Sequence, residues 1–152
     1  EMSRAFVKEG DGEDDGLPDR AISEHTNYVT QNGLALIDAE LTRLTAALAD
    51  IGDDRAARAA LERDLRYWRS RRATAEVVPT PTDTGEVRFG STVTIERDDG
   101  RRQTWRIVGE DEADPAKGAL SYIAPLAVAL IGKRVGDVVE IAGGEAEILA
   151  IS

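Results

Sequence analysis

The chain has 152 residues, of which 41% are hydrophobic and 5% aromatic, and it carries a net charge of −10 with no cysteine. A chain of this length holds one domain or two small ones, its acidic balance argues against autonomous binding to DNA or RNA, and the lack of cysteine excludes disulfides, thiolate metal sites and cysteine nucleophiles. No apolar run reaches the length of a membrane span and no signal peptide precedes the chain, so we expect a cytoplasmic protein with no membrane partner.

The first segment, residues 1–29, is predicted to be a disordered acidic tail. Between Lys8 and Arg20 the sequence is rich in Asp, Glu and Gly and has almost no side chains to bury. Such a segment gains too little from burial to offset the entropy that it would lose on ordering. Ile22, Tyr28 and Val29 are the apolar residues available to anchor its end on a folded domain.

The next segment, residues 30–78, is predicted to be an antiparallel helical hairpin with coiled-coil packing. Thr30 is a suitable N-cap for the first helix. Apolar residues then recur at alternating spacings of three and four, stop around Gly52, and resume with the same spacing. Folding the chain back at Gly52 brings the two apolar seams face to face. The first seam is Leu34, Ile37, Leu41, Leu44, Leu48 and Ile51, and the second is Ala57, Leu61, Leu65, Trp68, Arg72 and Ala75.

The turn between these two helices is acidic, with Asp50, Asp53 and Asp54 at the tip of the hairpin. One interpretation is that Asp53 or Asp54 caps the N-terminus of the second helix, where a negative charge also suits the helix dipole. The other interpretation is that the three carboxylates take part in binding a metal ion. The sequence leaves both open.

The second helix is rich in arginine, with 7 Arg against 5 acidic residues between Asp53 and Val77. A solvated helix face with intrahelical ion pairs explains this pattern most simply. The alternative is an autonomous nucleic-acid-binding module that uses this helix.

Residues 79–85 contain two prolines and a glycine and are predicted to be a linker, followed by a β domain over residues 86–152. Asp98-Asp99-Gly100 has the composition of a hairpin turn. We therefore expect an α+β fold, in which the helical hairpin precedes a small antiparallel sheet with one short helix. The expected strands are Val87–Phe89, Thr92–Glu96, Gln103–Val108, Leu120–Ile123, Val138–Ile141 and Glu145–Ile151.

Residues 119–137, ALSYIAPLAVALIGKRVGD, carry the most specific pattern in the chain. A strand leads into Pro125, which begins a short helix whose core face is Leu126, Leu130 and Ile131; Gly132 ends that helix. This run resembles the C-terminal domain of the bacterial Gre transcript-cleavage factors, the GreA/GreB family. Gly90–Val93 and Val108–Asp114 resemble two further motifs of that domain. The resemblance covers residues 30–151 and implies a β domain like that of FK506-binding proteins (FKBP-like).

The resemblance also implies a function and a partner. In this family the β domain docks at the rim of the secondary channel of RNA polymerase, and acidic residues at the hairpin tip help to hold a Mg²⁺ ion that the polymerase active site uses to cut backtracked RNA. The chain would then be a transcription elongation regulator, a monomer and not an enzyme, with no cofactor of its own and nucleic acid contacted only within the transcription complex. The implied polymerase-binding residues are Tyr122, Ile123, Ala124, Pro125 and Leu126.

Two departures from the family pattern separate this chain from the cleaving factors. Ala124 occupies a position where the family usually has Ser, and the Asp-Leu-x-Glu-Asn-Ala-Glu-Tyr motif of the cleaving factors is missing from the tip. A first helix of about 20 residues spans only about 30 Å. The chain thus resembles the short-hairpin, Rnk-like subfamily, for which we expect weak or no stimulation of cleavage. Because that subfamily was once described as regulators of nucleoside diphosphate kinase, such a kinase is the alternative partner.

Overall fold

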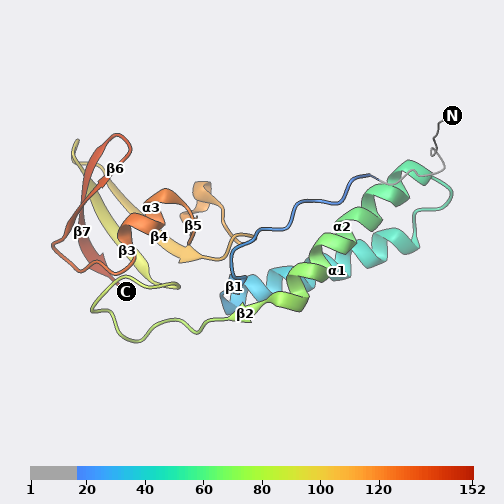
Figure 1. Cartoon of the computed structure of the whole chain (residues 1–152), viewed down its shortest axis with the longest axis horizontal. Coiled ribbons are helices and arrows are strands. Elements are labelled where there is room, and N and C mark those ends of the chain that lie inside the picture. Colours follow the sequence, from blue (N-terminus) through green and yellow to red (C-terminus); the bar gives the residue numbers. More distant parts are fainter. Residues whose placement is uncertain (1–16) are drawn as a thin grey trace, which may run out of the picture. The chain divides into compact units, whose positions relative to one another are not determined.

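The computed structural model describes residues 17–152, and most of the predicted acidic tail, residues 1–16, lies outside the described residues. The chain divides into two compact units (Figure 1). Among the described residues, the first consists of residues 17–25 together with Ile37–Thr74, and the second consists of Thr26–Leu36 together with Ala75–Ser152. Within residues 17–152, no helix combines the length and the hydropathy needed to cross a membrane.

The first unit is the predicted helical hairpin. Helix α1 (Gln31–Ala49) and helix α2 (Arg55–Thr74) lie side by side and run in opposite directions (Figure 1). Ile37, Leu44 and Leu65 are buried, as the seam pattern predicts. An ion pair between Arg72 Nε and Asp38 Oδ1, 2.7 Å apart, joins the two helices. The hairpin prediction is therefore confirmed.

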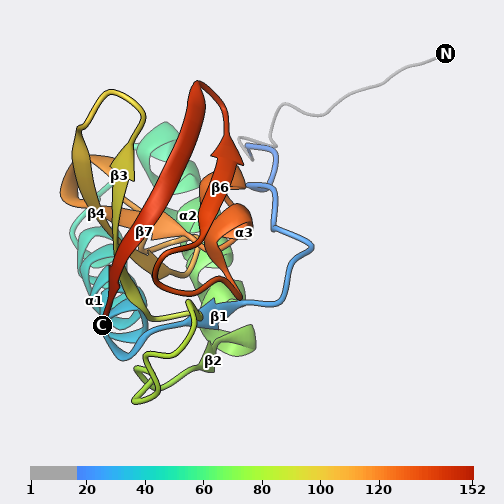
Figure 2. The ribbon, with the colours of Figure 1, turned by 90° about the vertical axis from the view of Figure 1, so that its left-hand side faces the viewer.

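The second unit is a five-stranded sheet with strand order β5-β4-β3-β7-β6 and one short α-helix, α3 (Pro125–Leu130), which lies against β6 (Figure 2). The α+β class is confirmed. Neighbouring strands are antiparallel as predicted, except that β4 and β5 are parallel. A 3₁₀ turn, Pro115–Lys117, supplies part of the crossover that a parallel pair requires. The strands are β3 (Thr92–Arg97), β4 (Arg102–Val108), β5 (Ala119–Ser121), β6 (Val138–Ile141) and β7 (Gly144–Ile151).

The predicted turn between β3 and β4 forms at Asp98-Asp99-Gly100, where Gly100 has a φ of +85°. The Asp99 carboxylate accepts hydrogen bonds from the backbone N–H of Arg101 at 3.0 Å and from its Nε at 2.7 Å. The backbone hydrogen bond, and then that of the Arg101 side chain, lower the pKa of the Asp99 carboxyl below its ordinary value. Local side-chain chemistry thus sets this hairpin.

The core of the second unit is one apolar cluster between the sheet and α3, and it follows the alternation of the strands. Two expectations are corrected here. Val87–Phe89 is not a strand, although Val87 is buried and exchanges backbone hydrogen bonds with Gly132 and Lys133. In α3 the core position falls on Ala127, while Ile131 remains 37% exposed. The cluster is Val87, Val93, Ile95, Ile107, Leu120, Ala127, Leu130, Val139, Ala146 and Ile148.

A short parallel pair of strands, β1 (Tyr28–Val29) and β2 (Glu76–Val77), was not expected from the sequence. With this pair of strands, the boundaries between the two units differ from the segment boundaries expected from the sequence. Residues 26–29, predicted as tail, and residues 30–36, predicted as hairpin, belong to the second unit, as do the residues of the predicted linker. Gly109 lies so close to this segment that a Cβ added to it would stand 2.3 Å from the Tyr28 carbonyl oxygen.

Helix α1 begins directly after Thr30, the predicted N-cap. The buried Thr30 hydroxyl accepts a hydrogen bond from the Gly33 N–H at 2.9 Å and donates one to the Glu112 carboxylate. Glu112 also accepts a hydrogen bond from Asn32 Nδ2 at 2.8 Å. The start of α1 is thus tied to the loop that follows β4, and the carboxylate lies where the helix dipole favours negative charge.

Candidate functional site

The corner between β5 and α3, residues 121–126, has a closely defined backbone. The backbone N–H of Ala124 donates to the Ser121 carbonyl at 3.0 Å, and that of Ile123 donates to the Ser121 hydroxyl at 3.3 Å. Ala124 is extended, with φ −64° and ψ 145°, as the residue before a proline prefers. Pro125 then occupies the first position of α3, where an N–H is not needed. The corner is therefore preorganised for binding.

The five residues predicted to bind a partner differ in exposure. Pro125 is exposed, whereas the other four are half-buried. Ala124 and Leu126 also pack against the apolar core of this unit. Of the five side chains, that of Pro125 is therefore the most accessible to solvent, and its neighbours Ala124 and Leu126 pack on the core.

Tyr122 has a structural role that the sequence did not reveal. Its ring lies 5.6 Å from the rings of both Tyr28 and Phe89, and its hydroxyl donates a hydrogen bond to the Thr26 carbonyl. These contacts hold the residues around β1 on the β domain. Of the five predicted residues, Tyr122 is thus the one most occupied by the protein's own packing.

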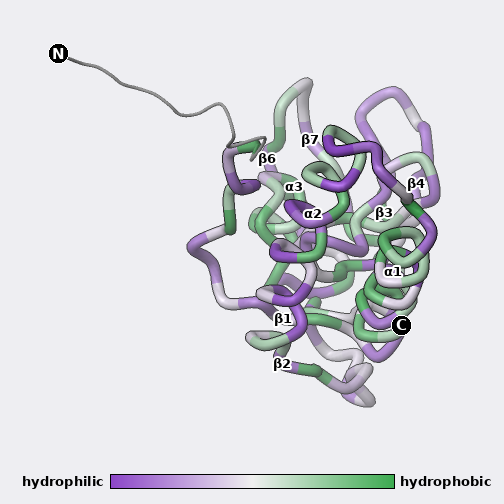
Figure 3. Tube along the Cα trace, turned by 90° about the vertical axis from the view of Figure 1, so that its right-hand side faces the viewer, coloured by the Kyte–Doolittle hydropathy of each residue, from purple (hydrophilic) through white to green (hydrophobic). Residues whose placement is uncertain are grey.

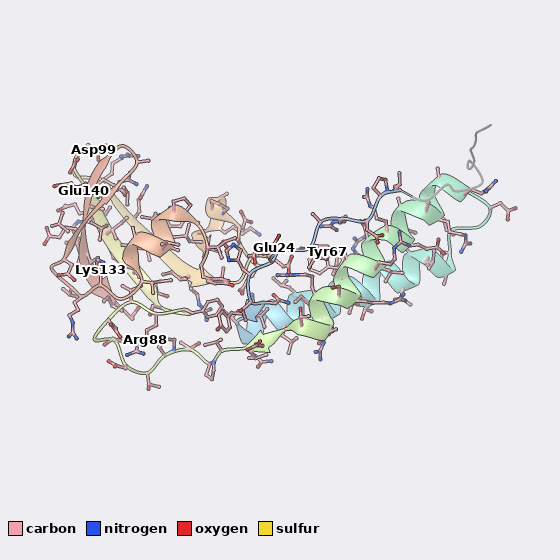
Figure 4. The ribbon with its side chains drawn as sticks, in the orientation of Figure 1. Glu24, Tyr67, Arg88, Asp99, Lys133 and Glu140 are labelled. Atoms are coloured by element: carbon pink, nitrogen blue, oxygen red, sulfur yellow. The ribbon has the colours of Figure 1, made fainter. Side chains whose placement is uncertain are left out.

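A groove of about 580 Å³ lies beside the corner and is lined by residues from three regions of the sequence. Its polar residues are Arg97 and Glu140, the latter labelled in Figure 4. The Arg97 guanidinium already donates to Gln103 Oε1 at 3.1 Å and to the Ala142 carbonyl at 3.3 Å. The exposed Glu140 carboxylate and the Arg97 guanidinium therefore place one charge of each sign beside the apolar lining of the groove. The remaining lining residues are Pro125, Leu126, Ile141 and Ala142.

Of the three acidic residues at the tip of the hairpin, one caps a helix and the other two are exposed. The Asp54 carboxylate accepts a hydrogen bond from the Ala57 N–H at 3.0 Å, which makes Asp54 the N-cap of α2. Gly52 turns the chain with a φ of +67°, and its carbonyl accepts a hydrogen bond from Arg58 at 3.1 Å. Within residues 17–152 there is no group of three or more acidic or histidine side chains that could hold a metal ion.

The arginines of α2 are largely engaged within the protein, and hydrophilic stretches are visible along this helix in Figure 3. Arg66 Nε lies 2.7 Å from Asp19, and Arg72 pairs with Asp38 of α1. Arg71 is buried, with 2% of its surface exposed. Besides the Arg63–Asp64 pair within α2, these arginines thus form pairs that join α2 to other segments.

Comparison with known proteins identifies relatives of both units. Residues 81–152 match the family model "Transcription elongation factor, GreA/GreB, C-term". The transcription elongation factor GreA of Chloroflexus aggregans is 35% identical over 142 residues, covering 79% of this chain and 90% of the relative. The transcription elongation factor GreB of Pasteurella multocida is 32% identical over 137 residues, covering 76% of this chain and 87% of the relative.

Solved structures of related factors also align with most of the chain. Gfh1, the GreA factor homolog 1 of Thermus thermophilus, is 22% identical and aligns with a TM-score of 0.40 over 84% of this chain and 99% of that protein. A GreA/GreB factor from Nitrosomonas europaea is 20% identical and aligns with a TM-score of 0.41 over 85% of this chain and 99% of that protein.

Proposed function

Because this chain belongs to the GreA/GreB family and is therefore a regulator of transcription elongation rather than an enzyme, we propose that it acts by docking on RNA polymerase at the secondary channel and stimulates transcript cleavage weakly or not at all. It does so as a monomer, and the only metal ion involved is the Mg²⁺ of the polymerase active site. The corner at Pro125 is the docking site.

The observation that carries the docking proposal is the exposed proline on a preorganised turn beside an apolar groove. A rigid apolar group loses little conformational freedom on binding, so most of its burial contributes to affinity. Glu140 and Arg97, which both line the groove, add a preference for a partner whose charges complement theirs. Tyr122, Ile123, Ala124 and Leu126 support the proline and complete the contact.

Two observations support weak cleavage. Helices α1 and α2 have 19 and 20 residues, so each arm of the hairpin spans about 30 Å. The alignment with the Chloroflexus relative has 142 positions, but it covers only 79% of the 152 residues of this chain, which is fewer than 142 residues. The relative therefore has additional residues inside the aligned region. The length of the arms favours a short hairpin of the Rnk-like type, whose tip carboxylates would not reach the polymerase Mg²⁺ from the rim, and additional residues in the hairpin of the relative would give it the longer reach.

The alternative functions are not favoured. The relatives are named as transcription elongation factors, which gives no support to a nucleoside diphosphate kinase as the partner. An autonomous nucleic-acid-binding module would need free arginines on α2, but Arg72 is paired with Asp38 of α1 and Arg71 is buried.

Substituting Pro125→Glu tests the docking proposal. Glutamate is acceptable at the first position of a helix, so the thermal melt should stay nearly unchanged. Affinity for core RNA polymerase, measured by pull-down and fluorescence anisotropy, should fall on the order of tenfold or more.

Ala116→Glu is the matched control, because it adds the same charge at an exposed position of the same unit outside the corner and the groove. This control should bind as the wild type does. Unchanged binding by a folded Pro125→Glu protein would show that the polymerase contact lies elsewhere.

A further inference from the structure

The N-terminal segment of residues 17–25, here called the strap, lies along α2 in the first unit (Figure 1). Asp19 Oδ1 lies 2.7 Å from Arg66 Nε, and Arg20 lies 3.4 Å from Asp64 Oδ1. Two neighbouring strap residues of opposite charge thus face two α2 residues of opposite charge. This complementarity defines one register of the strap on the helix.

An aromatic contact strengthens the same register. The Arg20 guanidinium carbon lies 3.9 Å from the centre of the Tyr67 ring and 5.8 Å from that of Trp68. A planar cation over an aromatic face is attracted by the ring electrons. Figure 4 labels Tyr67 on α2 and Glu24 on the strap. Beneath the strap is a pocket of about 180 Å³, which is lined by Asp19, Arg20, Ile22, Arg66, Tyr67 and Ser70.

These contacts suit release rather than permanent attachment. Between 38% and 70% of the Arg20, Asp19 and Arg66 side chains is exposed, so water and salt screen their ion pairs. Residues 17–25 have no helix or strand of their own. Leu65, by contrast, is buried in the hairpin, so the strap can leave without removing the packing that holds α2.

We propose that the strap is a releasable cover of α2 and that it competes with RNA polymerase for the face formed by Arg66, Tyr67 and Ser70. The competitor on the polymerase is a segment with neighbouring acidic and basic side chains, because such a segment would replace Asp19 on Arg66 and Arg20 on Asp64 and Tyr67. The proposal rests on the proposed function, since it concerns regulation of the same docking event. While the strap is in place, the hairpin surface available to the polymerase is reduced.

The test is a variant of the whole chain in which Asp19→Arg and Arg20→Asp are combined, so that the two residues exchange places. The net charge stays the same, but like charges now face Arg66 and Asp64. Covalent labelling of tyrosine read by mass spectrometry should show faster modification of Tyr67, with Tyr28 and Tyr122 as internal references. Affinity for core polymerase should rise roughly 3- to 10-fold, because binding no longer has to displace the strap.

Glu24→Gln is the control, since Glu24 is exposed on the strap and outside the contacts described above. It should match the wild type in both measurements. Thermal unfolding followed by the helical circular dichroism signal should confirm that every variant is folded. Unchanged Tyr67 labelling in the exchange variant would contradict the covering contact. Faster labelling with equal or weaker polymerase affinity would contradict competition alone. Absence of polymerase binding by all three proteins would overturn the docking proposal and the competition with it.

Discussion

At the hairpin tip, the structure gives a defined role to one of the three acidic residues. Both interpretations of the tip acids were open in the sequence, and the structure assigns capping to Asp54 through its hydrogen bond to Ala57. Asp50 and Asp53 are exposed and belong to no group of side chains, among residues 17–152, that could hold a metal ion. The capping role follows from local geometry, because Asp54 lies three residues before Ala57, whose N–H donates the hydrogen bond to its carboxylate.

Asp54→Ala tests the capping role. The N-terminus of α2 loses its side-chain acceptor, so the free energy of unfolding of the hairpin should fall by about 1 kcal/mol. The measurement is urea unfolding followed by helical circular dichroism. Asp54→Asn keeps an acceptor oxygen and should lose much less stability. An equal loss in both variants would show that charge, rather than the hydrogen bond, accounts for the effect.

At the scale of elements, the segments with a periodic apolar pattern or a specific motif could be predicted, and the two-residue strands could not. The apolar spacing predicted α1 and α2, and alternation predicted β3, β4, β6 and β7 within one or two residues. Strands β1 and β2 have two residues each, too few to show any period, and the groove is lined by residues from regions far apart in the sequence. Val87–Phe89 was predicted as a strand because apolar and polar residues alternate there, but the backbone partners of Val87 are Gly132 and Lys133 rather than a neighbouring strand.

Gly109→Ala tests the contact between the β1 segment and the end of β4. The new Cβ would lie 2.3 Å from the Tyr28 carbonyl oxygen, so the backbone of one segment must move. We expect the free energy of unfolding of the second unit to fall on the order of 2 kcal/mol. Thermal unfolding followed through near-UV circular dichroism measures this loss.

The control is Gly85→Ala, whose Cβ would meet only the flexible Asp83 side chain. It should change stability little. If Gly109→Ala and Gly85→Ala both unfold at the temperature at which the wild type unfolds, the close approach of Tyr28 and Gly109 is absent in solution.

At the scale of the whole molecule, the proposed docking corner and the acidic hairpin tip lie in different units. The corner and groove belong to the second unit, whereas the tip acids belong to the first. A factor that docks through the corner but does not supply a carboxylate to the polymerase Mg²⁺ would occupy the channel without promoting cleavage. It would then inhibit a cleaving Gre factor that needs the same site.

The most direct test of this account is the rate of RNA cleavage in a backtracked transcription complex. The protein alone should leave the rate near that of polymerase without any factor, and adding it before a GreA-type factor should slow cleavage by that factor. Pro125→Glu should abolish the inhibition, while the joint substitution of Asp50→Asn, Asp53→Asn and Asp54→Asn should preserve it. Cleavage by the wild type at a rate near that of a GreA-type factor, lost in the triple variant, would contradict the account and make the tip catalytic.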